Sequence, residues 1–280
     1  MQHGFHITFD RRGHGPLHLN GASWDDTTAR MLRVLAPWNL VAACVVHDHL
    51  HTLLLVDRET AGRASQALEC SLGWSLRPTS SEAGTWWNPP RFTPIRDARH
   101  LTDTVRYILP NGVASVDDAV SLLSWRWSTI WEALGLRFTG FELCRDVPDT
   151  SRSATAALVF GDRKWQPTPA PFIHEPEEPV AHLIQVAKAA TGFCLERPFT
   201  RKIASRSTRD VAIALARSRG WHPSAIAAAL SISIDTVERA TVLDPLDPRF
   251  LAARSLLTET AYLGSLAVAP PGPGRLHGRR

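Results

Sequence analysis

Cysteine and tyrosine are scarce in this chain, which has four cysteines and two tyrosines among 280 residues. None of the cysteines forms a C-x-x-C pair, which argues against a zinc knuckle and indicates reduced thiols in a cytoplasm. The apolar runs stop well short of the roughly 20 residues that a membrane span needs. The N-terminus has no apolar segment followed by a cleavage site, so we expect neither a signal peptide nor a membrane partner.

Charge gives a weak indication of an anionic partner. The net charge is +4 and the isoelectric point is about 9.2. Basic residues gather between 197 and 219, where Asp210 is the one acid. The basic residues of this run are Arg197, Arg201, Lys202, Arg206, Arg209, Arg217 and Arg219. Arginine suits bidentate phosphate contacts, although a solvated helical face would explain the same charges.

The first half of the chain alternates strand-like and helix-like patterns. Their order, strand–helix–strand–strand–helix–strand, predicts an α+β fold, namely a ferredoxin-like antiparallel sheet with helices on one face. We expect strands within 4–10, 39–57 (two strands, or one bent strand) and 91–97, and helices over 24–38, 59–76 and 97–109, the last stopped or kinked by Pro110. The tryptophan-rich segment 121–136 is expected to pack inside the protein rather than to form a stacking surface.

We divide the chain into a first domain over 1–150, a linker over 151–179, a helical domain over 180–263 and a disordered basic tail over 264–280. The linker assignment depends on five prolines between 160 and 179. After the linker the pattern is almost entirely helical.

The stretch "HPSAIAAALSISIDTVERA" (222–240) has helix–turn–helix spacing. Pro223 stands at a first helical position, "SIS" (231–233) breaks the helix, and a second short helix presents Thr236 and Arg239. An ordinary helical hairpin would show the same pattern. The longer segment 206–240 resembles the DNA-binding domain of the bacterial replication initiator, in which an early arginine and the recognition helix contact duplex DNA. The expected DNA contacts here are Arg201, Lys202, Arg206, Arg209, Thr236 and Arg239.

Three histidines interrupt the apolar stretch "VVHDHLHTLLLV" (45–56). On a strand, residues two apart point to the same face, so His47, His49 and His51 could project together. Two imidazoles at this spacing can share one divalent metal ion. The alternative is that these side chains form hydrogen bonds at the surface of a sheet.

Tyr107 in "VRYILPNGV" (105–113) is one of the two tyrosines, and it lies on an expected helix four residues before Asn111. An i, i+4 pair shares one helical face, so the phenol and the carboxamide could face the same metal ion. A metal ion, a tyrosine and a phosphodiester form a chemically coherent set, because a cation polarises the phosphate that the phenolate attacks.

These two motifs resemble those of the HUH single-strand DNA transposases, and residues 4–136 as a whole resemble the REP-associated tyrosine transposases. The resemblance implies that His49 and His51 are metal ligands, that Asn111 is a third polar ligand, and that Tyr107 is the nucleophile. It also implies Mg²⁺ or Mn²⁺ as the cofactor. Arg11, Arg12 and Arg106 are candidate contacts to the DNA strand. The chain departs from the family at His47, Asp48 and Pro110.

The expected function is therefore that of a metal-dependent nickase and strand transferase in a bacterial cytoplasm, at the nucleoid. It would act on single-stranded DNA hairpins through a 5′-phosphotyrosine, and would bind duplex DNA through the C-terminal helices. One alternative is a non-catalytic DNA-binding regulator that acts through 222–240. Another is a zinc hydrolase that uses His47, His49 and His51, although the chain has no H-E-x-x-H signature.

Overall fold

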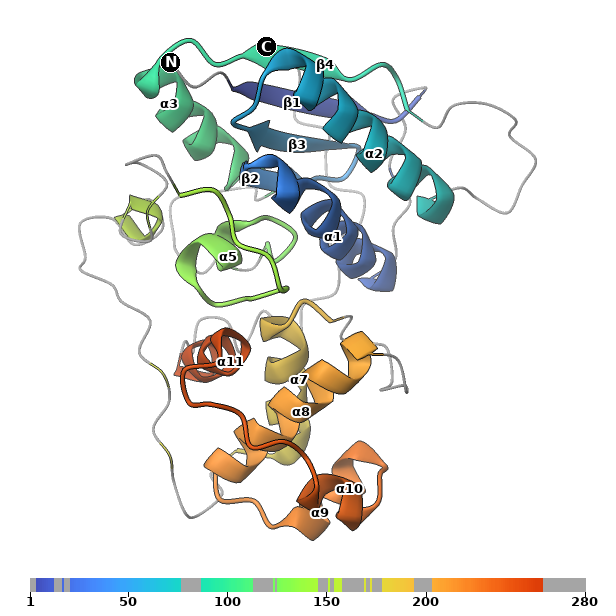
Figure 1. Cartoon of the computed structure of the whole chain (residues 1–280), viewed down its shortest axis with the longest axis vertical. Helices are drawn as coiled ribbons and strands as arrows, with labels where there is room; N and C mark the ends of the chain where they lie inside the picture. The colour runs from blue at the N-terminus through green and yellow to red at the C-terminus, as the bar shows by residue number, and fades with distance from the viewer. Residues whose placement is uncertain are drawn as a thin grey trace.

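One antiparallel sheet and two groups of helices make up the described part of the protein (Figure 1). Within that part, no helix is both long enough and apolar enough to cross a membrane. A computed structural model of the chain describes residues 4–12, 17, 21–76, 87–112, 123, 125–145, 151, 154–157, 169, 172, 178–193 and 203–258.

The sheet has the strand order β2-β3-β1-β4, and every neighbouring pair is antiparallel. Its strands are β1 (Phe5–Asp10), β2 (Leu40–Val45), β3 (His49–Leu54) and β4 (Arg91–Pro94). The stretch 39–57 thus forms two strands joined by a tight turn. The prediction of an α+β protein with an antiparallel sheet is confirmed.

Helices lie on both faces of this sheet. On one side are α1 (Gly21–Leu35) and α2 (Arg58–Leu76), which pack against each other; a short 3-10 helix, η1 (Ala36–Trp38), follows α1. This face carries the odd-numbered residues of β1, since the guanidinium of Arg58 in α2 lies 5.9 Å from the ring centre of Phe5. The other face carries His6 and Thr8, and α3 (Ala98–Ile108) packs there against β2 and β3. The expectation of helices on one face was therefore wrong for α3.

Tryptophans fill the core beside α1. Trp24 and Trp127 lie in a tilted contact with ring centres 5.0 Å apart, and Trp125 packs edge-on against both. Trp131, in the short helix α5 (Ile130–Leu134), is fully buried. The prediction that segment 121–136 packs inside the protein is confirmed for its described tryptophans.

Segment 125–129 covers the outer edge of β2. Val45 N donates to Trp127 O at 3.0 Å, and Thr129 N donates to Ala43 O at 2.8 Å. The hydroxyl of Thr129 also accepts a hydrogen bond from Ala43 N at 2.9 Å. These bonds satisfy backbone groups that an open edge strand would leave exposed for pairing with another chain.

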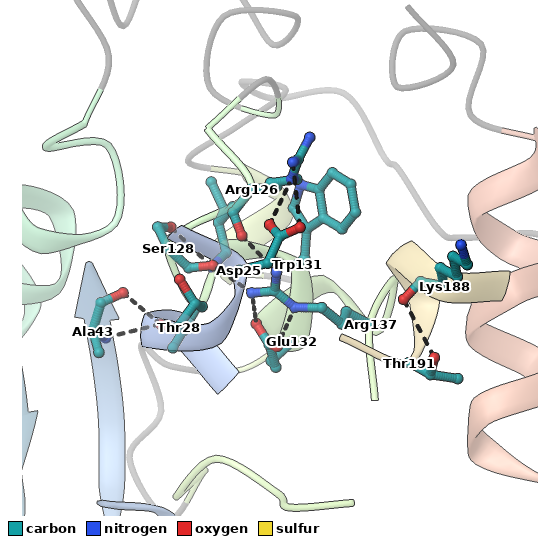
Figure 2. A network of polar contacts seen from close by, with 12 residues as sticks. Asp25, Thr28, Ala43, Arg126, Ser128, Trp131, Glu132, Arg137, Lys188 and Thr191 are labelled. Carbon is teal, nitrogen blue, oxygen red and sulfur yellow. Dashed lines mark hydrogen bonds and ion pairs between the residues drawn. The ribbon is translucent and has the colours of Figure 1, made fainter. Parts of the chain in front are cut away.

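Two buried ion pairs hold this segment in place (Figure 2). Arg126 donates to Asp25 at 3.1 Å, and Trp127 Nε1 donates to the same carboxylate at 2.9 Å. Arg137 pairs with Glu132 and also donates to the carbonyl of Ser128 at 2.9 Å. Because these side chains are almost fully buried, removing one partner of either pair would leave the other charge buried without compensation.

The helical half packs around α7 (Val180–Ala190), which contacts both α8 (Ile203–Ser218) and α11 (Pro248–Thr258). Two shorter helices, α9 (Pro223–Leu230) and α10 (Ile234–Glu238), pack together at its lower end in Figure 1. Ser231 takes the left-handed conformation at the break between them.

The two halves touch each other. Phe138 N donates to Ala190 O at 2.7 Å, at the end of α7. A methyl group built on Gly192 would lie 2.5 Å from the side chain of Thr139, so the two backbones approach closely. Most of the expected linker and all of the expected tail lie outside the described residues.

The Asp25–Arg126 pair supplies a first prediction. Asp25→Ala should lower the free energy of unfolding by about 3–5 kcal/mol, because Arg126 would keep a buried charge without its acid partner. Urea-induced unfolding measures this loss. Glu59→Ala is the matched control: Glu59 is exposed and lies 3.9 Å from Arg63 on the surface of α2, so its removal should cost less than about 1 kcal/mol. Equal losses in the two variants would contradict the assignment.

Candidate active site

The turn between β2 and β3 separates His47 from the other two histidines. β2 ends at Val45 and β3 begins at His49, so His47 lies in the turn, where its carbonyl accepts a hydrogen bond from Leu17 N at 2.9 Å. The expectation that all three histidines project from one strand was wrong for His47. Within the described residues, no three His, Cys, Asp or Glu side chains are placed to hold a metal ion together. The three-histidine zinc site therefore lacks support.

His49 and His51 do converge. Their Nε2 atoms lie 2.7 Å apart, and their rings are perpendicular with centres 4.5 Å apart. Two nitrogen ligands at adjacent positions around one metal ion lie about 3 Å apart, given metal–nitrogen bonds of roughly 2.0–2.1 Å. The pair therefore fits two ligands directed at a common point.

Asp48 fixes the orientation of His49. Its Oδ1 lies 2.5 Å from His49 Nδ1. The hydrogen bond from His49 holds the pKa of the Asp48 carboxyl below its usual range. A carboxylate that accepts from Nδ1–H leaves the Nε2 lone pair of the same ring available for a metal ion. This arrangement would make His49 a better metal ligand.

His51 is held from the other side by β1. Its Nδ1 lies 3.0 Å from His6 Nε2 and 3.4 Å from Thr8 Oγ1. Burial lowers the pKa of His51 to about 2, with the charges of His49 and His6 adding to this effect. Burial also lowers the pKa of His6 to about 4, helped by the charge of His100. Both rings are neutral at neutral pH, and neutral imidazole is the form that binds metals.

Tyr107, on α3, lies beside the rings of His6 and His51. Its ring centre lies 5.2 Å from that of His51 and 5.9 Å from that of His6, and 53% of the residue is exposed. Asp97 caps the helix by accepting a hydrogen bond from His100 N at 2.8 Å. The structure thus brings the proposed nucleophile beside His51, one of the two proposed histidine ligands, while leaving it open to solvent.

Asn111 is not part of the same helix as Tyr107. α3 ends at Ile108, as Pro110 predicts, and Asn111 lies in the following turn. The i, i+4 geometry that placed it on the helical face of Tyr107 therefore does not apply. Its Nδ2 atom is buried and has no hydrogen-bond partner within the described residues. The structure thus shows two converging imidazoles, while Asn111 lies in the turn that follows the tyrosine helix.

Cys44 lies next to His51 on the neighbouring strand, where the two residues are paired in the sheet. Burial raises the pKa of its thiol to about 12, so it stays protonated and is a poor metal ligand. Cys44, Cys70 and Cys144 are free thiols, and Cys194 lies outside the described residues.

The expected DNA contacts fall into two groups far apart in Figure 1. Arg11 and Arg12 follow the end of β1, and Arg106 is exposed beside Tyr107, so all three belong to the sheet half. The others belong to the helical half: Arg206 and Arg209 on α8, Thr236 on α10 and Arg239 at its end, with Arg201 and Lys202 outside the described residues.

Sequence reasoning missed His6 and Thr8. The stretch "FHITFD" alternates apolar and polar residues, which marks a strand with one polar face. That alternation is the signal that could have found them. The alternation does not show which strand pairs with this one. Only the observed pairing of Thr8 with His51 places the polar face of β1 at the site.

Comparisons with protein-family models, with curated proteins and with solved structures found no match for this chain. The chemistry of the site must therefore be inferred from its own geometry. That geometry is a pair of convergent imidazoles, a carboxylate behind one of them and an exposed phenol beside the other.

Gly112 gives a testable prediction about how the tyrosine helix is anchored. A methyl group at Gly112 would lie 1.9 Å from the ring of Trp125, whose Nε1 donates to Val45 O at 3.0 Å. Since that hydrogen bond and burial restrain the ring, Gly112→Ala should destabilise the protein by about 1–3 kcal/mol.

Thermal unfolding would measure the effect. Gly73→Ala is the matched control, because Gly73 lies within α2 with open space around it, and alanine should raise stability there by up to about 1 kcal/mol. A gain in stability from both substitutions would contradict the close packing of Gly112 on Trp125.

Proposed function

We propose that this protein is a metal-dependent nickase and strand transferase of single-stranded DNA, with Tyr107 as nucleophile. One observation carries the proposal: the Nε2 atoms of His49 and His51 converge to 2.7 Å, and the Tyr107 ring lies 5.2 Å from His51. Two imidazoles suit a divalent metal ion, and a phenol beside one of them suits attack on a phosphodiester.

The order of elements supports a ferredoxin-like sheet domain for residues 1–150. β1, α1, β2, β3, α2 and β4 follow one another along the chain, and the sheet order is β2-β3-β1-β4. This is the split β-α-β arrangement, in which each helix connects two strands that flank a third. It sets β1 and β3 side by side at the centre, where the histidines lie.

The proposed reaction begins with the phenol of Tyr107. Phenols are poor nucleophiles at neutral pH, because free tyrosine has a pKa of about 10. Held by His49 and His51, Mg²⁺ or Mn²⁺ would supply charge that polarises the phosphate and favours the phenolate. The Tyr107 proton passes to solvent and its oxygen attacks phosphorus. The bond from phosphorus to the 3′-oxygen then breaks, and that oxygen takes up a proton.

The products are a 3′-hydroxyl and a 5′-phosphate ester on Tyr107. Because the ester keeps the energy of the phosphodiester, a 3′-hydroxyl can attack it in turn and rejoin a strand without ATP. Tyr107 has the exposure that such an exchange needs. Arg106, exposed on the same helix, is suited to contact the phosphates of a DNA hairpin, as are Arg11 and Arg12 after β1.

In the helical half we propose a duplex-DNA surface formed by α8 rather than by α10. Helix α10 and its end carry exposed Asp235 and Glu238, and Arg239 is bonded to Asp235 at 3.2 Å. Thr236 is engaged with the Ser233 hydroxyl at 2.7 Å. Acids in this position repel phosphate, so the helix–turn–helix arrangement of α9 and α10 is a weaker candidate for DNA contact than the basic start of α8.

A second candidate function, a DNA-binding regulator without catalysis, is favoured by the position of Asn111. This residue lies past the end of α3, and its buried Nδ2 atom has no hydrogen-bond partner within the described residues. A site with two ligands would hold a metal ion more weakly than one with three. The two functions differ in whether a covalent protein–DNA product forms.

Tyr107→Phe tests the enzyme directly, since it removes one oxygen and little volume. With Mn²⁺ and labelled single-stranded hairpins from the flanks of the gene, the variant should bind DNA but form no denaturation-resistant adduct. Tyr262→Phe is the matched control, because it changes the only other tyrosine, and should retain the adduct. Metal-dependent nicking by Tyr107→Phe would rule out the tyrosine mechanism, and hairpin binding without any adduct in the wild type would favour the regulator.

Arg206→Ala tests the duplex-DNA surface. Arg206 is exposed near the start of α8, so its loss should weaken duplex binding and lower the slope of log affinity against log salt by about 1. Fluorescence anisotropy over a salt series measures both. Arg239→Ala is the matched control and should change little, because that guanidinium already pairs with Asp235. A larger effect at Arg239 would instead support α10 as the recognition helix.

A further inference from the structure

His51 needs a partner for its second ring nitrogen. Its Nε2 faces His49 Nε2 at 2.7 Å, and its Nδ1 faces His6 Nε2 at 3.0 Å. If Nε2 binds a metal ion, the ring proton must sit on Nδ1, where it requires an acceptor inside the protein because His51 is only 3% exposed. His6 Nε2 is the nearer of the two groups able to accept it, since Thr8 Oγ1 lies at 3.4 Å.

The sheet itself aims His6 at this nitrogen. β1 and β3 are paired so that Thr8 lies opposite His51 and His6 lies opposite Leu53. Residues on the same face at the diagonal position of an antiparallel pair are within reach of a long or aromatic side chain. The rings of His6 and His51 accordingly lie with centres 5.1 Å apart, tilted by 39°.

We infer that His6 is a positioning residue, which orients the ring of His51 and fixes its tautomer for metal binding. The inference rests on the proposed metal site of His49 and His51. In this role His6 engages Nδ1 of His51, as Asp48 engages Nδ1 of His49. The Asp48 carboxylate lies 2.5 Å from that nitrogen. Each ligand then has its outer nitrogen engaged and its inner nitrogen directed at the common point.

An imidazole suits this position better than a carboxylate because it can serve both states of the site. Without a metal ion, the tautomer of His49 that donates from Nδ1–H to Asp48 has Nε2 as an acceptor, and His51 Nε2 then carries the proton that bridges the 2.7 Å gap. His51 Nδ1 then accepts from His6 Nε2–H. When a metal ion binds, the proton of His51 moves to Nδ1 and His6 Nε2 becomes the acceptor. A neutral imidazole has one donor and one acceptor nitrogen, so His6 fits either arrangement by exchanging its tautomer.

The metal affinity of variants tests this role without any measurement of nicking. His6→Leu keeps a large apolar side chain but offers no acceptor, and should weaken Mn²⁺ binding by about 10- to 100-fold. His6→Gln, whose carboxamide has both an acceptor and a donor, should recover most of the affinity. His47→Leu is the matched control in the neighbouring turn and should leave the affinity unchanged. Electron paramagnetic resonance of free Mn²⁺ in titrations of the full chain gives all four dissociation constants.

A spectroscopic reading of the wild type supplements the variants. With saturating Mg²⁺, which is diamagnetic, ¹⁵N NMR of the imidazoles should show His51 protonated at Nδ1, and His6 should lose its proton from Nε2. In His6→Leu this pattern at His51 should be lost. Mn²⁺ affinity in His6→Leu equal to that of the wild type would overturn the inference, as would an equal loss in His47→Leu or His51 protonated at Nε2 with Mg²⁺ bound.

These outcomes separate the inference from the proposed function. Wild-type protein that binds Mn²⁺ and loses affinity in His6→Leu, but forms no DNA adduct, would uphold the positioning role and refute the nickase. An adduct formed equally well and at equal Mn²⁺ affinity by His6→Leu would uphold the nickase and refute the role of His6. Wild-type protein that binds no Mn²⁺ would refute the metal site and the inference together.

Discussion

The antiparallel pairing of β1 with β3 is the constraint on which the rest of the site depends. In this register Thr8 lies opposite His51 and Asp10 lies opposite His49, so the polar faces of both strands coincide. The odd-numbered residues of β1, Phe5, Ile7 and Phe9, point to the opposite face, where α1 and α2 pack. A shift of the β1–β3 register by one residue would turn the apolar side chains toward α3 and the imidazoles toward the apolar core. Because the apolar side chains must be buried under α1 and α2, this register is fixed and the histidines stay together.

A second requirement is that α3 be held at a definite distance from this polar face. Leu101, Val105 and Ile108 are buried against the sheet, while Tyr107 on the same helix remains exposed. Past the helix end, Gly112 lies against Trp125, whose indole is tied to the carbonyl of Val45 at the end of β2. The tyrosine is thus anchored through the strand next to the one that carries His49 and His51.

Features that depend on short-range chemistry could be read from the sequence. Alternating apolar residues predicted β1, Pro110 predicted the end of α3, and His49 and His51 were recognised as a same-face pair. His47 and Asn111 were misplaced because a strand and a helix were each extended by two or three residues past their ends, and same-face arguments fail at such ends. His6 was missed for a different reason: its neighbour lies 45 residues away, and strand pairing over that separation leaves no local pattern.

Segment 125–138 joins these requirements to the second half of the molecule. Trp125 at its start packs on Gly112 beneath the tyrosine helix, and Phe138 at its end is hydrogen-bonded to Ala190 in α7. Between these two residues, Arg126 forms a buried ion pair with Asp25, and Arg137 forms one with Glu132.

Ion pairs buried to this degree contribute little net stability compared with apolar residues, but removing one partner is costly. Their effect is therefore to permit one arrangement of the segment and to penalise others. The same segment contacts both the turn after Tyr107 and the end of α7. The candidate site and the helical half are therefore both attached to segment 125–138, whose own conformation is fixed by its ion pairs. A proline-rich linker alone would not fix the two halves in this way.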